Sequence, residues 1–89
     1  MSEVEVRLAP LLHSYTQGAS VVRGHGATVG EVLDDLDRRY HGLRFRLIDE
    51  QDRLRPHMRL FVGREAARDI RRPLADGDEL LIFGALSGG

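Results

Sequence analysis

The residues of this chain best suited to chemistry are its last two, Gly88 and Gly89. A carboxylate that follows two glycines has no side chain nearby to obstruct in-line attack, and so narrow a segment can thread a channel that excludes water. An apolar run, Glu79–Phe83, stands a few residues before them. We therefore expect a terminal carboxylate that is presented to the active site of another protein. Glycine-rich termini also occur without any function, so these residues alone leave both interpretations open.

Other reactive side chains make poor candidates for a catalytic or metal site. Asp76-Gly77-Asp78 has the composition of a tight turn and no further ligand types arranged around it. Gly24-His25-Gly26 lacks the lysine and the spacing of a phosphate-binding loop. The histidines share no ligand spacing and are expected at the surface or in turns: His13, His25, His41 and His57. Because the chain also contains no cysteine, we predict that it is not an enzyme and binds no metal or cofactor itself.

Length and charge limit the remaining possibilities. The 89 residues form one domain, which we assign to residues 1–84, with 85–89 as an extended, flexible tail. The net charge of −1 comes from 14 acids and 13 arginines interleaved along the chain, which disfavours nucleic-acid binding. The acidic start, Met1–Glu5, is unlike a secretory signal, and no apolar run approaches the roughly 18 residues of a membrane span. We expect a cytoplasmic protein without membrane attachment.

The first half of the chain predicts two strands and one helix. Residues Glu3–Leu8 alternate with period two, as expected for a half-buried strand. A wide turn over Leu11–Gly18 leads to a second strand, Ala19–Arg23, which Gly24-His25-Gly26 should end. Thr28 and Glu31 then form a capping box. A helix of about twelve residues follows, with an apolar stripe at helical spacing: Val29, Val32, Leu33, Leu36 and Tyr40.

The second half predicts two more strands. The mixed segment Leu43–Pro56 can seat a short helical turn before a polar loop. The run His57–Val62 alternates again, with Met58, Leu60 and Val62 expected to face inward. Gly63–Arg72 is a polar connection that Ile70 can pin to the core. An Asp-Gly turn then feeds the last strand.

Two strands, a capped helix and two or more further strands predict an α+β domain in which one face of a mixed sheet cradles the main helix, a β-grasp layout. The other face of the sheet would then stay open. Phe61, Leu81 and Phe83 would point outward there and form an apolar patch, which is typical of a partner surface. The alternative is that one or two of these side chains pack under the long connection.

Several segments together resemble the ThiS/MoaD sulfur-carrier family. The stretch Leu74–Leu80, which contains Asp76-Gly77-Asp78, followed by an apolar strand and Ser87-Gly88-Gly89, is similar to that family's closing signature. Ala27–Leu33 is similar to its entry into the helix, and Arg59–Gly63 to its fourth element. The segment around Pro10–Gly18 and the long connection before Pro56 make the chain more similar to the actinobacterial CysO and MoaD-like branch than to shorter ThiS proteins. The resemblance covers nearly the whole chain.

The resemblance implies a ubiquitin-like β-grasp fold and a specific mechanism. A ubiquitin-activating-like enzyme of the MoeB/ThiF type would adenylate the Gly89 carboxylate with ATP, and a sulfur donor would convert it to a thiocarboxylate. A sulfur-accepting biosynthetic enzyme would then use that sulfur for cysteine, molybdopterin, thiamin or a secondary metabolite. Gly88 and Gly89 would be the site that is modified, whereas the residues that bind the partners would be Phe61, Leu81, Phe83, Leu86 and Ser87.

Two alternatives stay open at this point. A ubiquitin-like modifier, joined through Gly89 to lysines of other proteins, would share the fold, the tail and the activation step. Since the chain has no lysine, such a modifier could not be linked to the lysine side chains of its own copies. A plain binding module that uses only the open sheet face would lose nothing on deletion of Gly89.

Overall fold

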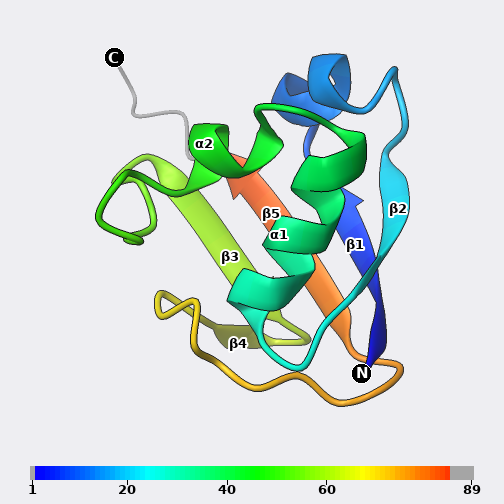
Figure 1. Cartoon of the computed structure of the whole chain (residues 1–89), viewed down its shortest axis with the longest axis vertical. Helices are drawn as coiled ribbons and strands as arrows, with labels where there is room; N and C mark the ends of the chain where they lie inside the picture. Colours follow the sequence, from blue (N-terminus) through cyan, green and yellow to red (C-terminus); the bar gives the residue numbers. More distant parts are fainter. Residues whose placement is uncertain (1, 85–89) are drawn as a thin grey trace.

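The computed structural model describes residues 2–84 and shows a mixed five-stranded sheet with α1 across one face (Figure 1). The strand order is β2-β1-β5-β3-β4. The strands are β1 (Glu3–Leu8), β2 (Val21–His25), β3 (Met58–Val62), β4 (Glu65–Ala66) and β5 (Glu79–Gly84). The helices are the 3-10 helix η1 (Pro10–Tyr15), α1 (Val29–Arg39) and α2 (Leu43–Leu47). This is the predicted β-grasp layout.

Strand β5 occupies the centre of the sheet. It runs parallel to β1, with Val6 opposite Leu80, and antiparallel to β3, with Leu60 opposite Ile82. The pairs β1–β2 and β3–β4 are antiparallel. A parallel neighbour requires a crossover connection, and α1 with the segments around it provides that connection between β1 and β5. The last strand is therefore paired on both sides.

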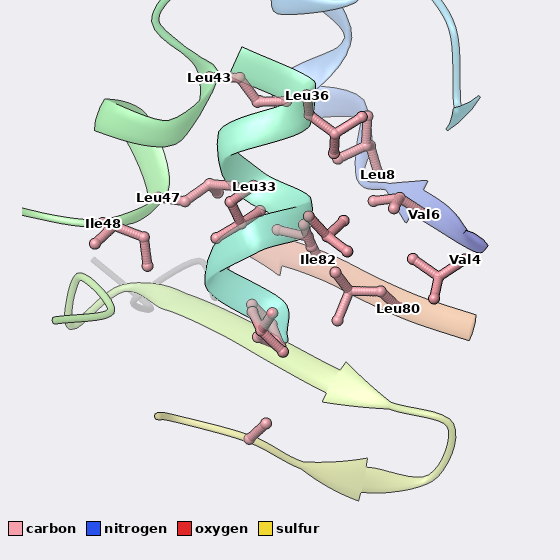
Figure 2. Close-up of a cluster of buried hydrophobic side chains, with 14 of the residues drawn as sticks. Val4, Val6, Leu8, Leu33, Leu36, Leu43, Leu47, Ile48, Leu80 and Ile82 are labelled. Atoms are coloured by element: carbon pink, nitrogen blue, oxygen red, sulfur yellow. The ribbon is translucent and has the colours of Figure 1, made fainter. Parts of the chain in front are cut away.

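The core lies between the sheet and the two α-helices. Leu33 of α1 lies beside Leu47 of α2, and Leu36 lies near Leu43 of α2 and Leu8 of the first strand (Figure 2). Leu33 and Leu36 of α1 and Leu80 and Ile82 of β5 are each no more than 1% exposed. Leu43 and Leu47 of α2 are fully buried beside them, which confirms the predicted short helical turn in this connection. The inward residues of β1 and β3 are those that the alternation predicted: Val4, Val6, Leu8, Met58, Leu60 and Val62.

The capping of α1 follows the sequence prediction with one difference. The Thr28 hydroxyl accepts a hydrogen bond from the Glu31 backbone N–H at 3.2 Å. The Glu31 carboxylate, however, accepts from the N–H of Ala27 at 2.8 Å, one residue before the cap. The helix has eleven residues and ends with Arg38 and Arg39, whose charges suit the negative end of the helix dipole. The predicted capped helix is thus confirmed.

The predicted bounds of the second strand were wrong at both ends, and Gly24 explains the error at the C-terminal end. The strand begins at Val21 rather than Ala19 and continues through Gly24 to His25. An added Cβ on Gly24 would stand 2.7 Å from Cγ1 of Val32, so the missing side chain lets α1 approach the strand closely. Glycine therefore acts here as a packing residue, and the prediction that it breaks the strand fails for that reason.

Two connections contain more structure than predicted. The segment expected to be a wide turn after β1 forms η1, with Leu12 buried and Leu11 40% exposed. The connection Gly63–Arg72, predicted to be irregular, contains β4, which pairs Phe61 with Ala66. Ile70 packs against the core as expected, and its carbonyl accepts from the N–H of Gly30 at 2.7 Å. Within residues 2–84, no helix is long and apolar enough to cross a membrane.

Candidate functional site

The candidate site begins where β5 ends. Strand alternation turns Leu80 and Ile82 toward α1 and leaves Leu81 and Phe83 on the opposite, open face. Gly84, the last residue of the strand, lies opposite Met58 at the start of β3. A Cβ on Gly84 would stand 2.5 Å from Cδ2 of Leu11, so η1 packs closely against the other side of this residue. The chain therefore leaves the sheet between η1 and the first residue of β3.

Three apolar side chains form a contiguous patch on the open face beside this exit. Phe61 of β3 lies opposite Leu81, and its ring stacks on that of Phe83 with centroids 5.7 Å apart. Phe83 remains 36% exposed, whereas Phe61 and Leu81 are half-buried. Both helices labelled α lie on the other side of the sheet (Figure 1). We call Phe61, Leu81 and Phe83 the open-face patch; the predicted outward placement of all three is confirmed.

A shallow hollow of about 210 Å³ adjoins the open-face patch. It lies between the ends of β1 and β5, and its lining includes Leu8, Ala9, Leu81 and Phe83. A hollow of this size next to exposed aromatic carbon can receive a single apolar side chain from a partner. The geometry is that of a docking surface, without groups that could carry out a reaction.

The remaining half of the open face is mainly polar, apart from the exposed Val21 of β2. Arg7 of β1 contacts Glu79 at 2.6 Å and Glu5 at 3.0 Å, while Glu3 lies 3.5 Å from Arg23 of β2. The hydrogen bond to Glu79, together with the charges of Glu79 and Glu5, raises the pKa of Arg7 above its ordinary value. These charges are mutually paired and solvent-exposed. The apolar half of the face is thus bordered by a neutralised polar half.

Asp76-Gly77-Asp78 forms the predicted turn, and its carboxylates are occupied by backbone groups. Asp78 accepts from the N–H of Ala75 at 2.8 Å, and Asp76 accepts from the N–H of Glu3 at 2.8 Å. Gly77 has a positive φ of 88°, which glycine adopts without strain. In the part of the chain that the structure describes, no three acidic or histidine side chains gather as metal ligands. The turn therefore aligns β1 with the start of β5.

His25, His41 and His57 are exposed at the surface, as predicted. His13 is half-buried in η1, with Nε2 2.9 Å from the Leu8 carbonyl oxygen, and His57 is exposed just before β3. His25 lies on strand β2, with Nε2 3.2 Å from Glu3 and Nδ1 3.6 Å from Asp35. The side chains of His13, His25 and His57 contact different groups.

The predicted tail residues Leu86, Ser87, Gly88 and Gly89 lie outside the described residues. Their roles, and the division into residues 1–84 and 85–89, stay predictions. Leu11 is a residue of the exit that sequence reasoning missed. The pair Leu11-Leu12 directly after Pro10 could have indicated it. In a short helix, one leucine of such a pair can be buried while its neighbour contacts a different surface.

The model of the ThiS family matches residues 11–89. The chain belongs to the ThiS family. The sulfur carrier protein CysO of Mycobacterium tuberculosis is 32% identical over 91 aligned positions, which cover 97% of this chain and 98% of that protein. The small archaeal modifier protein 3 of Haloferax volcanii is 38% identical over 66 positions, covering 71% of each chain.

Solved structures support the same assignment for this ThiS family member. CysO in the Amycolatopsis orientalis BexX/CysO complex superposes with a TM-score of 0.89 at 32% identity and covers 97% of this chain and 99% of that one. Mycobacterium tuberculosis CysO gives a TM-score of 0.87 at 30% identity, covering 93% and 99%. The predicted ubiquitin-like β-grasp fold and the resemblance to the CysO branch are confirmed. The names of these relatives describe a sulfur carrier and a modifier protein.

Proposed function

We propose that this protein is a sulfur carrier whose Gly89 carboxylate is activated and converted to a thiocarboxylate. The match to the ThiS family extends to residue 89, and the CysO relatives are aligned over nearly their whole length. The observation that carries the proposal is the position of β5. This central strand bears Leu81 and Phe83 on the open face, ends at Gly84 and continues directly into residues 85–89.

The chemistry needs two steps at the Gly89 carboxyl group. In the first step, a Gly89 carboxylate oxygen attacks the α-phosphorus of ATP, the bond to the β-phosphate breaks, and pyrophosphate leaves. In the second step, a sulfur nucleophile attacks the acyl carbon of the adenylate, and AMP leaves with the electron pair of the broken C–O bond. This chain binds no cofactor in the proposal; the adenylating partner binds ATP. Glycines at positions 88 and 89 leave the carboxylate oxygen free to attack phosphorus in the first step and the acyl carbon open to the sulfur nucleophile in the second.

The partners are an adenylating enzyme of the MoeB/ThiF type and a sulfur-accepting biosynthetic enzyme. The open-face patch supplies the anchor that such a partner needs, because clustered aromatic side chains dominate binding energy at interfaces. Leu86 and Ser87 would contact the wall of the channel that receives the tail. A CysO relative was crystallised in complex with BexX, which supports direct docking of such a carrier to another protein. We place this reaction in the cytoplasm.

The first step can be tested by pyrophosphate release. The full chain and a variant that lacks Gly89 are each incubated with ATP and the adenylating enzyme of the same organism. We expect ATP-dependent release of pyrophosphate with the full chain and background release with the truncated one, while both give the same circular dichroism spectrum. Equal release from the two chains would overturn the proposal, as would the absence of release from the full chain.

The second candidate function is protein modification through Gly89. The similarity to the small archaeal modifier protein 3, and to the structure of SAMP1 from Haloferax volcanii at a TM-score of 0.82 and 32% identity, favours it. Both functions begin with adenylation, so only the products separate them. Isopeptide-linked conjugates in cell extract that disappear on deletion of Gly89 would support modification, whereas a free thiocarboxylate form supports the carrier. A binding module without chemistry would retain its function after that deletion.

A further inference from the structure

A second surface adjoins the exit of β5 on the side away from the open-face patch. It is a groove of about 320 Å³ beside α2, which we call the α2 groove, lined by Tyr15, Phe45, Arg46, Glu50, Arg55 and His57. His57 directly precedes Met58, the residue opposite Gly84. Helix η1 places Leu11 against Gly84 and Tyr15 in the groove. A partner that receives the residues after Gly84 must therefore pass close to the α2 groove.

The wall of the α2 groove exposes an aromatic ring. Phe45 is 61% exposed and is the most exposed large apolar side chain among residues 2–84. Leu43 and Leu47 turn the other side of α2 into the core, so Phe45 cannot be buried by the same helix. The guanidinium of Arg55 lies 4.6 Å from the Phe45 ring centroid, and its Nε donates to the Phe45 carbonyl at 2.7 Å. The ring is thus held in place at the surface.

The groove also carries positive charge that lacks a carboxylate partner in the described part of the chain. Neither Arg46 nor Arg55 has an acidic oxygen within 4.0 Å there, in contrast to Arg44, which contacts Asp34 at 2.8 Å and Asp52 at 3.0 Å. Arg46 Nη1 instead lies 3.2 Å from Nε2 of His57. Glu50 is the acidic residue of the lining, and Asp49, just outside it, interacts with the charges of both Arg55 and Arg53. Arg46, Arg53 and Arg55 against Asp49 and Glu50 leave an excess of positive charge next to exposed aromatic carbon.

We infer that the α2 groove docks an acidic segment of the enzyme that receives the tail, with an apolar side chain against Phe45 and Tyr15 and carboxylates at Arg46 and Arg55. The inference rests on the proposed function for the identity of this partner. We choose an acidic segment because the groove carries excess positive charge. We choose the enzyme that receives the tail because η1 contacts both the end of β5 and the α2 groove. The open-face patch and the α2 groove would then hold the partner on two sides of the exit.

A titration that does not involve Gly89 tests this inference. The ¹⁵N-labelled full chain is titrated with a short blocked peptide of alternating glutamate and leucine, and with the same peptide carrying glutamine for glutamate. We expect amide shifts concentrated at Phe45, Arg46 and His57 with the acidic peptide and much smaller shifts with the glutamine peptide. Added salt should weaken binding, because the contacts are ionic and partly exposed. Arg46→Gln should weaken binding about threefold, the size of one partly exposed ion pair.

Arg64→Gln is the matched control. Arg64 follows β3 at the end opposite His57, and it likewise has no acidic oxygen within 4.0 Å among the described residues. Its substitution should leave the affinity unchanged. Shifts centred on the open-face patch, equal binding of the two peptides, or no binding would each overturn the inference. Line broadening that depends on protein concentration alone would identify a second copy as the occupant, and would overturn it too. If the groove inference fails but Gly89 is still activated, the proposed function of the protein stands.

Discussion

The rings of Phe61 and Phe83 stack across the adjacent strands β3 and β5, with their planes 8° from parallel. They occupy diagonal positions, because Phe61 lies directly opposite Leu81 and Phe83 lies opposite Arg59. Side chains in this relation lie within reach of each other on one face of a sheet. The stack gives the open face a rigid aromatic surface one residue before the last described position of the chain.

We predict that Phe83→Asp weakens binding to the adenylating enzyme by about tenfold or more, since a charge replaces a buried aromatic anchor in the complex. Phe61→Asp should act similarly. Folding should be retained, because both side chains face away from the core. Calorimetric titration measures the affinity. Val21→Asp, on the same face but on the edge strand β2, is the control and should bind normally. Wild-type affinity of the Phe83 variant would remove the patch from the account.

The outer edge of β2 is protected by α1. The backbone N–H of His25 donates to Asp35 at 3.0 Å, and Arg39 donates to the carbonyl of Arg23 at 2.6 Å. Ladder bonds to β1 are made at alternate residues, so these two groups point to the unpaired side of the strand. Removing both side chains by Asp35→Ala and Arg39→Ala should expose a strand edge that pairs with another copy.

Sedimentation velocity tests this effect. The double variant should show association that increases with concentration, whereas wild type stays at one species. Arg38→Ala is the control, since Arg38 contacts Asp35 but has no hydrogen bond to β2 in the described structure. A double variant that sediments like wild type would show that Asp35 and Arg39 do not guard the edge.

Asp35 should also make stability depend on pH. Partial burial by itself would raise its pKa, but the hydrogen bond from His25 and the charges of Arg39 and Arg38 lower the pKa below the ordinary value of 3.8. A carboxyl whose pKa is lower in the folded state stabilises the fold above about pH 4, and this contribution is lost as pH falls through the folded pKa. The free energy of unfolding, measured with urea, should therefore fall more steeply below about pH 4 for wild type than for Asp35→Asn. Parallel curves would contradict this.

The Asp76-Gly77-Asp78 turn should behave as a structural element rather than as a metal site. Asp78→Ala removes the acceptor for the Ala75 N–H and should lower the free energy of unfolding by about 1 kcal/mol. Addition of calcium, magnesium or EDTA should leave the wild-type melting temperature unchanged. The control Glu50→Ala, at an exposed loop position, should change stability by less than about 0.5 kcal/mol. A metal-dependent increase in melting temperature would refute the structural role.

Much of the fold could be predicted from local patterns. The capping pair Thr28 and Glu31 sits within one turn of helix, and the alternation in β1 and β3 reflects burial on a single face, so both are visible in short stretches of sequence. The opposite holds for Gly24, whose role depends on Val32 of another element. A glycine that breaks a strand and one that admits a helix are identical in a local window.

The site was predictable to the extent that it lies on a regular strand. The outward direction of Phe61, Leu81 and Phe83 followed from alternation alone. The α2 groove did not, because it joins η1, α2 and the start of β3, three segments whose proximity is set by tertiary packing. The contact between Leu11 and Gly84 belongs to the same class. Sites of this kind combine residues that are far apart in the sequence, so they cannot be predicted even when every helix and strand is assigned correctly.

The most direct measurement of the central claim is the location of sulfur on the chain. The protein is incubated with ATP, its adenylating enzyme and sulfide, and the product is analysed by intact and fragment mass spectrometry. We predict that one oxygen is replaced by sulfur and that the change appears only in fragments containing Gly89. A chain that is adenylated but carries no sulfur at Gly89, or that carries sulfur elsewhere, would contradict the account.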